Sequence, residues 1–173
     1  FLKIFRDENG NHESMVQRMY RMIRVVDGEA SITIATSKSQ IALIKNQLGD
    51  NVDISIEPCR RDTFPAIALS VAYLHDVKHI SENDSVVVCP VDSLVERGYF
   101  EVLKQLYNAS ELGEANLCLM GIKPSYPSDK YGYIIPKKDY VEFKEKPDVE
   151  LASEYIRQGA LWNGGVFAFK VKY

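Results

Sequence analysis

Charged residues crowd one short segment of the chain. Residues 57–66, EPCRRDTFPA, hold two adjacent arginines and two carboxylates. They lie between a strand-like run at Val52–Ile56 and a helical pattern at Ile67–Val77. Anionic ligands of α/β sheets bind outside the carboxyl ends of the strands, and arginine donors suit phosphates and nucleobase edges. The segment therefore predicts a phosphorylated or nucleotide ligand.

A structural role fits the same segment. Arg60 and Arg61 could form surface ion pairs on a solvated turn, and Asp62 or Thr63 could cap the following helix. Pro65 in the first helical turn would lose no needed hydrogen bond. Capping and ligand binding are compatible, because a helix N-terminus also attracts anions.

A second candidate, Asp92, follows the apolar run Ser85–Cys89. A carboxylate at the carboxyl end of a buried strand can hold Mg²⁺ together with substrate phosphates. Asp92 or Ser93 could equally cap the next helix, and position alone favours neither interpretation.

The stretch FKEKPD, residues 143–148, ends a strand-like pattern. Alternation sets Lys144 and Lys146 on one face and Glu145 on the other unless the chain kinks at Pro147. Glu145 could accept hydrogen bonds from sugar hydroxyls, and a lysine could meet a phosphate. Composition alone favours a charged edge strand closed by proline.

Two glycine-containing sites have similar alternatives. Asn163 lies in Trp162–Gly165, where Asn-Gly predicts a hairpin turn but could also present an amide to a ligand approached closely at the glycines. Gly132, inside a strand-like run, marks a bulge or a place where a ligand meets the backbone.

Strand-like and helical patterns alternate over the first two-thirds of the chain, which predicts a parallel, doubly wound sheet. The carboxyl ends of its strands should bring three turns together, at Thr36–Lys38, Glu57–Thr63 and Pro90–Ser93. The last third predicts added antiparallel strands, and hence a mixed sheet. Strands are expected at 31–36, 52–56, 85–89, 116–122, 131–135, 140–144 and 166–171, and helices at 14–25, 39–48, 66–79, 99–106 and 149–157.

Composition sets broad limits. With 173 residues, 46% of them apolar, the chain can form one domain with a sizeable core. A net charge of −3 argues against general nucleic-acid binding, and no apolar run is long enough to cross a membrane. Three cysteines without CxxC spacing fit a reducing compartment, so we expect a cytoplasmic protein.

Six segments, in order, resemble the mannose-1-phosphate guanylyltransferases of the sugar nucleotidyltransferase family. FLKIF resembles the end of PKQFLKLF, EPCRRDTFPAIAL resembles EPxxRNTAPAIAL, and VCPVDS resembles LPADH. GIKPSYPSDKYGYI resembles GIxPTxPxTGYGYI, FKEKPD resembles FxEKPD, and GALWNGGVFAF resembles GxYxWNSGMFxF.

The resemblance implies a Rossmann-like nucleotidyltransferase domain, with a mixed, mostly parallel sheet flanked by helices. The implied reaction joins GTP and mannose 1-phosphate into GDP-mannose and pyrophosphate, with Mg²⁺ offsetting phosphate charge. By position in the motifs, Asp92 resembles the metal ligand and Lys146 the lysine that meets the phosphate. Glu57, Arg61 and Thr63 fall in the nucleotide-base region, and Gly132, Glu145 and Asn163 match hexose contacts.

Several residues depart from the family pattern. Arg60, Asp62 and Phe64 replace its Gly, Asn and Ala, Ser93 replaces its His, and WNGGV replaces WNSGM. Asp62 in particular weakens the guanine assignment, because an acid stands where the family has an amide.

The family's Gly-rich loop would precede Phe1, and its C-terminal region would follow Tyr173. We therefore expect residues 1–173 to be a partial domain without activity of its own. Homo-oligomer formation stays open. The alternatives are a transferase for another nucleotide or hexose 1-phosphate, and a non-catalytic nucleotide-sugar-binding homologue.

Overall fold

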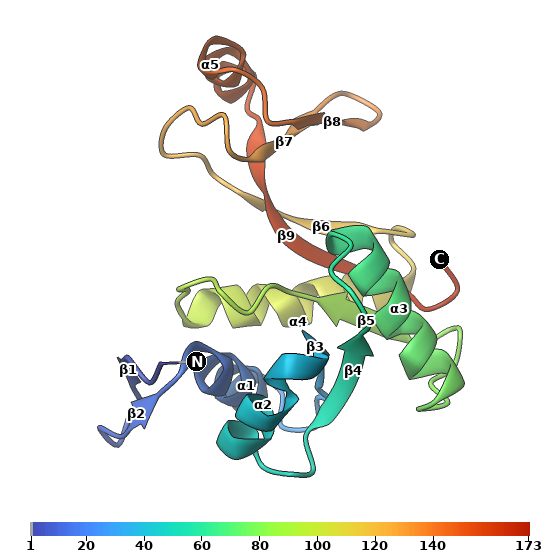
Figure 1. Ribbon diagram of the computed structural model, residues 1–173. Helices are drawn as coiled ribbons and strands as arrows, with labels where there is room; N and C mark the ends of the chain where they lie inside the picture. The colour runs from blue at the N-terminus through green and yellow to red at the C-terminus, as the bar shows by residue number, and fades with distance from the viewer. Residues whose placement is uncertain (1) are drawn as a thin grey trace.

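The computed structural model describes residues 2–173. Figure 1 shows a larger part of the molecule, with most of the helices, and a small lobe connected to it by the long strand β9. The small lobe consists of β7, β8, α5 and the first residues of β9. The helices are α1 (Met15–Val26), α2 (Ile41–Leu48, after a 3-10 turn at Lys38–Gln40), α3 (Thr63–Asp76), α4 (Arg97–Leu112) and α5 (Val149–Arg157). The strands are β1 (Phe5–Arg6), β2 (His12–Glu13), β3 (Thr33–Ser37), β4 (Asp53–Glu57), β5 (Ser85–Val88), β6 (Cys118–Ile122), β7 (Gly132–Pro136), β8 (Val141–Glu145) and β9 (Leu161–Lys170).

The strands form three separate sheets. β1 and β2 make a small antiparallel hairpin, and β3 pairs in parallel with β4. The third sheet has five strands in the order β5-β9-β7-β8, with β6 also paired to β9. All of its pairs are antiparallel. The expectation of an α/β fold with a mixed sheet agrees with this architecture only in part, because the sheets are small and β3–β4 is the one parallel pair among the described residues.

Strand β9 explains why the sheet is not mostly parallel. Ala168 lies opposite Val87 of β5 and also opposite Cys118 of β6. Both strands run antiparallel to β9 and so parallel to each other, but β9 lies between them. The apolar pattern at Ser85–Cys89, typical of a buried parallel strand, did not reveal this antiparallel neighbour.

Most of the expected elements are present, with shifted ends. Ser14 caps α1 in a reciprocal capping box with Gln17, and Gly49 ends α2. The hairpin turn predicted at Asn163–Gly164 is wrong, because both residues lie inside β9.

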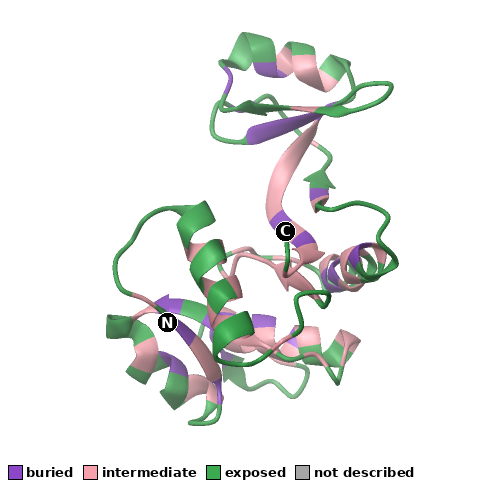
Figure 2. Ribbon diagram, turned by 90° about the vertical axis from the view of Figure 1, so that its right-hand side faces the viewer, coloured by how far each residue is buried: buried purple, intermediate pink, exposed green. Residues whose placement is uncertain are grey.

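Three clusters of buried apolar side chains stabilise these layers. The first joins α1 and α4 to the five-stranded sheet, the second joins α1 and α2 to β3 and β4, and the third joins α5 to β7. In Figure 2, the buried residues of the small lobe lie between α5 and the strands beneath it. The central side chains are Met22, Phe100 and Val166 in the first cluster, Val16, Ile34 and Ile44 in the second, and Tyr133, Ile135 and Ala152 in the third.

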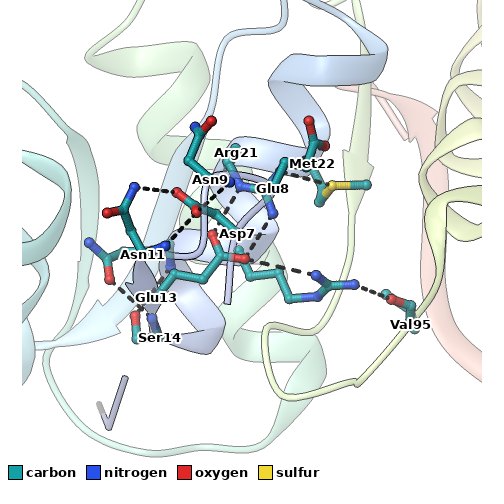
Figure 3. A network of polar contacts seen from close by, with 11 residues as sticks. Asp7, Glu8, Asn9, Asn11, Glu13, Ser14, Arg21, Met22 and Val95 are labelled. Atoms are coloured by element: carbon teal, nitrogen blue, oxygen red, sulfur yellow. Dashed lines mark hydrogen bonds and ion pairs between the residues drawn. The ribbon is translucent and has the colours of Figure 1, made fainter. Parts of the chain in front are cut away.

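An ionic network fastens the N-terminal hairpin to α1 (Figure 3). Arg21 donates two hydrogen bonds to the buried carboxylate of Glu13, at 2.9 and 2.8 Å. Arg18 donates to the carbonyl of Val95 at 3.0 Å, which links the hairpin side of α1 to the segment before α4. Asp7 accepts from the backbone N–H groups of Asn9 and Asn11 and closes the hairpin turn. The network is structural, because its charges satisfy one another.

A second polar network ties α3 and the residues after it to the β3–β4 pair. Asp53 accepts hydrogen bonds from Thr33 at 2.5 Å and from Tyr73 at 2.8 Å, and Lys78 lies 3.0 Å from the same carboxylate. Burial pushes the pKa of Asp53 upward, but the three donors outweigh burial and hold this pKa below its usual value.

We predict that Asp53→Asn lowers the free energy of unfolding by about 1–3 kcal/mol at pH 7, the range for hydrogen bonds to a charged group. Because the folded-state pKa of Asp53 is depressed, its stabilisation is full above the unfolded-state pKa and is lost as pH falls through the folded one. Urea unfolding at pH 7 and at about pH 3 measures both effects.

The matched control is Asp50→Asn, which changes an exposed carboxylate three residues away. It should leave the stability unchanged at both pH values. A loss for Asp53→Asn that persists undiminished at low pH would contradict the assignment.

Candidate functional site

Three of the predicted residues lie in a row across the small lobe. Gly132 of β7 is paired with Glu145 of β8. On the other side of β7, Tyr133 is opposite Trp162, so the same register sets Gly132 beside Asn163 of β9. Asn163 is in turn opposite Gly121 of β6. The backbone pairing therefore brings Glu145, Gly132 and Asn163 together, although they come from three different strands of the chain.

Gly132 is needed because the chain is crowded on its side-chain face. A Cβ at this position would lie 2.8 Å from Oε2 of Glu145 and 2.8 Å from Cζ of Phe143. The β7–β8 register is regular through Gly132, so the bulge interpretation is wrong. The remaining interpretation, close approach, applies here to the side chain of Glu145, which lies over the glycine.

Lys146 has a backbone conformation that side chains rarely adopt. Its φ is +44°, and its N–H donates to the carbonyl of Tyr131 at 3.2 Å. This turn ends β8 before Pro147 and breaks the alternation expected from an extended strand. As a result Lys146 Nζ reaches Glu145 Oε1 at 3.1 Å, and both side chains remain more than half exposed. Left-handed backbone at a non-glycine residue is costly, and such strain is concentrated at functional sites.

The amide of Asn163 is held in one orientation. Its Oδ1 accepts a hydrogen bond from the N–H of Gly165 at 3.1 Å, and Gly165 has a φ of +67°. Because the oxygen is engaged, the Nδ2 group is the part of this side chain left to donate to a ligand.

The turn that carries Asp92 meets the same strand. A Cβ on Gly165 would lie 3.9 Å from Cγ of Pro90, so the turn after β5 runs past the Asn163–Gly165 segment. α4 begins only at Arg97, and Glu96 occupies its cap position. The interpretation of Asp92 or Ser93 as the helix cap is therefore wrong.

The segment 57–63 lies at the carboxyl end of β4, where Glu57 pairs with Ser37 of β3. Two of the three predicted turns are thus side by side. The third, at Pro90–Ser93, follows a strand that pairs with neither β3 nor β4 among the described residues, and its proximity to them stays a prediction.

Asp62 caps α3, which is the structural role considered for it from the sequence. Its carboxylate accepts from the N–H of Thr63 at 2.8 Å, and its φ is +76°. Asp and Asn tolerate positive φ better than most residues, which explains how Asp can stand where the family has Asn. Arg61 is exposed, and its Nε donates to Cys59 Sγ at 3.4 Å.

The structure gives limited support for a metal centre. Within residues 2–173, no three His, Cys, Asp or Glu side chains converge as a metal cluster would require. Asp92 fits the alternative in which Mg²⁺ takes one carboxylate and substrate phosphates. Two clefts of about 400 and 450 Å³ flank the N-terminal hairpin, away from the row of Glu145, Gly132 and Asn163.

Comparisons with known proteins agree with this geometry. The family model described as nucleotidyl transferase matches residues 8–173. The chain belongs to the nucleotidyl transferase family. A mannose-1-phosphate guanylyltransferase of Escherichia coli is 33% identical over 73% of this chain and 29% of its own length. The alginate biosynthesis protein AlgA of Pseudomonas aeruginosa is 30% identical over 83% of this chain and 32% of its own length.

A solved structure shares the fold of this nucleotidyl transferase chain. It is a mannose-1-phosphate geranyltransferase from Thermus thermophilus, with a TM-score of 0.76 and 29% identity, and the match covers 95% of this chain and 49% of the other. The chain spans about a third of the length of the curated relatives it matches. The resemblance to mannose-1-phosphate guanylyltransferases is thereby confirmed. None of the helices within residues 2–173 is long and apolar enough to cross a membrane.

Sequence reasoning missed an aromatic group beside the row. The ring of Trp162 lies 5.1 Å from that of Tyr126 and 4.8 Å from that of Tyr131, measured between centroids. Trp162 Nε1 is buried with no hydrogen-bond partner. The signal was available, since Tyr126 lies in the Pro/Ser-rich loop at 123–130 and the other two flank Gly132 and Asn163.

We predict that Gly132→Ala displaces the side chains of Glu145 and Phe143 without unfolding the domain, because both can rotate away from the new methyl group. The free energy of unfolding should fall by about 1 kcal/mol or less, within the range for an off-rotamer side chain. Chemical shifts of the Glu145 carboxyl carbon and the Phe143 ring measure the displacement.

Gly98→Ala is the control, because nothing lies within 4 Å of a Cβ there and the residue is in the first turn of α4. It should stabilise slightly and leave those shifts unchanged. Unmoved Glu145 and Phe143 signals in Gly132→Ala would refute the close approach.

Proposed function

We propose that this chain forms the hexose side and part of the nucleotide side of a sugar-1-phosphate nucleotidyltransferase. The proposed reaction transfers a guanylyl group from GTP to mannose 1-phosphate and gives GDP-mannose and pyrophosphate. The observation that carries the proposal is the row of Glu145, Gly132 and Asn163, with Lys146 at its end, in a chain of this family. Relatives named mannose-1-phosphate guanylyltransferase support the choice of sugar and nucleotide.

The hexose would lie over Gly132, between two polar side chains. The carboxylate of Glu145 accepts hydrogen bonds from sugar hydroxyls, and Asn163 Nδ2 donates to a sugar oxygen because its Oδ1 is held by Gly165. These groups fix the orientation of mannose 1-phosphate, and such positioning is the main contribution a protein makes to phosphoryl transfer.

Charge neutralisation is assigned to two residues. Lys146 meets the phosphate of mannose 1-phosphate, whose oxygen attacks the α-phosphorus of GTP while the bond to pyrophosphate breaks. Asp92 would hold Mg²⁺, which offsets phosphate charge when bound. Glu57, Arg61 and Thr63 are assigned to the nucleotide, with Arg61 as the donor for the base.

We predict that Lys146→Ala weakens binding of GDP-mannose to the chain about tenfold or more, since a contact to a charged group is worth about 1.5–3 kcal/mol. Titration of the ¹⁵N-labelled chain with GDP-mannose measures this affinity and shows which amides shift. Lys144→Ala is the control, because Lys144 lies two residues away and pairs with Glu142 at 2.8 Å. Equal effects of the two variants would overturn the role given to Lys146.

The nucleotide assignment predicts a preference for guanine. GDP-mannose should bind more tightly than ADP-glucose or UDP-glucose, and Arg61→Ala should reduce the preference while Arg60→Ala leaves it intact. Competition between the three nucleotide sugars measures it. A chain that favours ADP-glucose or UDP-glucose is a transferase for another nucleotide, and one that binds none of them contradicts the proposed function.

A further inference from the structure

Two strands of the molecule each have an unpaired edge. β3 pairs only with β4, and β5 pairs only with β9, among the residues that the structure describes. The second edge of each strand therefore presents backbone N–H and C=O groups without a neighbouring strand, an arrangement that promotes pairing with another extended segment.

The same helix covers both strands. Val16 of α1 packs in the cluster with Ile34 of β3, and Met22 of α1 packs in the cluster that includes Val87 of β5. Val91, three residues after β5, packs against both clusters. The two unpaired strands consequently belong to one layer beneath α1.

Helix α3 is apolar on most sides, yet none of its residues is buried. It packs against β4 and β3, and Ile67, Val71 and Leu74 are only half-buried. Ser70 Oγ is shielded from solvent and has no hydrogen-bond partner. A helix that is hydrophobic all round is normally buried, so α3 lacks part of the layer that it should cover.

We propose that one further β-strand, largely apolar, inserts between β3 and β5 and joins the two sheets into one. A single strand has two free edges and can pair with both at once, at about 4.8 Å from each. It must be apolar because it would lie between α1 and α3, and strands covered on both faces are hydrophobic.

The strand comes from polypeptide outside residues 1–173. The relatives extend well beyond the matched region, which is 29–37% of their length in three of them and 49% of the Thermus thermophilus chain. A second folded copy of this chain offers only an edge of its own sheets, which can pair with β3 or with β5 but cannot fill the space between them.

The inserted strand also bears on the candidate site. If it runs parallel to β3, it ends between Ser37 and the Pro90–Ser93 turn, so the residues after it enter the region of Asp92. The insertion itself rests on the unpaired edges and on α3, and it does not depend on the proposed reaction.

The experiment compares the 173-residue chain with two fusions. One adds the part of the Escherichia coli mannose-1-phosphate guanylyltransferase that precedes its matched region, and the other adds the part that follows it. A Gly/Ser segment of equal length is fused in place of each as a control. Amide hydrogen exchange of β3, β5 and α3 is measured against β9, whose edges are both paired, and light scattering gives the mass.

We expect the chain alone to be a monomer in which β3 and β5 exchange faster than β9. One of the two fusions should slow exchange in β3 and β5 together by about tenfold or more, a sign of a shared cooperative unit, and the Gly/Ser controls should not.

Three results would overturn the proposal. The first is protection of β3 and β5 equal to that of β9 in the monomeric chain. The second is protection that rises with concentration as a dimer forms. The third is unchanged exchange in both fusions, or equal protection by the Gly/Ser segments. None of these readouts involves GDP-mannose, so failure of the proposed function would be seen separately.

Discussion

Strand β9 has ten residues of backbone, and its donors and acceptors must be satisfied along two edges. β6 follows one edge, while β7 and then β5 follow the other. This pairing fixes where the small lobe lies relative to α4 and the larger cluster. It also sets Asn163 beside Gly132 and carries the strand past the Pro90 turn. The candidate hexose residues and the candidate metal ligand thus share one strand as their reference.

Small residues and unusual backbone angles concentrate along that strand and at its neighbours. Gly121, Gly132 and Gly164 each face an atom closer than about 3.4 Å to where a Cβ would be. Of the three non-glycine residues with positive φ among those described, Asp62 and Lys146 belong to the candidate site. Packing in the core does not require such conformations, whereas holding a polar group toward a ligand does.

The sequence predicted most of the elements, because helical periodicity and the caps at Ser14 and Asp62 are local signals. It failed where the outcome depended on distant partners. Ser85–Cys89 looked like a strand of a parallel sheet, and only the pairing with Phe167 and Ala168 shows that its neighbour is antiparallel. Asn163–Gly164 looked like a turn because a short-range rule cannot detect that β6 and β7 pair with the flanking residues. Ordered motifs named the candidate site residues, but the row across β8, β7 and β9 depends on register, which the sequence does not specify locally.

The ion pairs of the molecule separate into two kinds by burial. Glu13 is buried and held by two hydrogen bonds from Arg21, so removing either partner would leave a charge that water cannot reach. Lys146 and Glu145 are paired on the surface, with side chains 61% and 59% exposed, and such pairs are worth about 0–1 kcal/mol. A phosphate and a sugar hydroxyl can therefore replace this pair at little cost. The weaker ion pair is the one suited to bind and release a substrate, and the stronger one is suited to keep the N-terminal hairpin on α1.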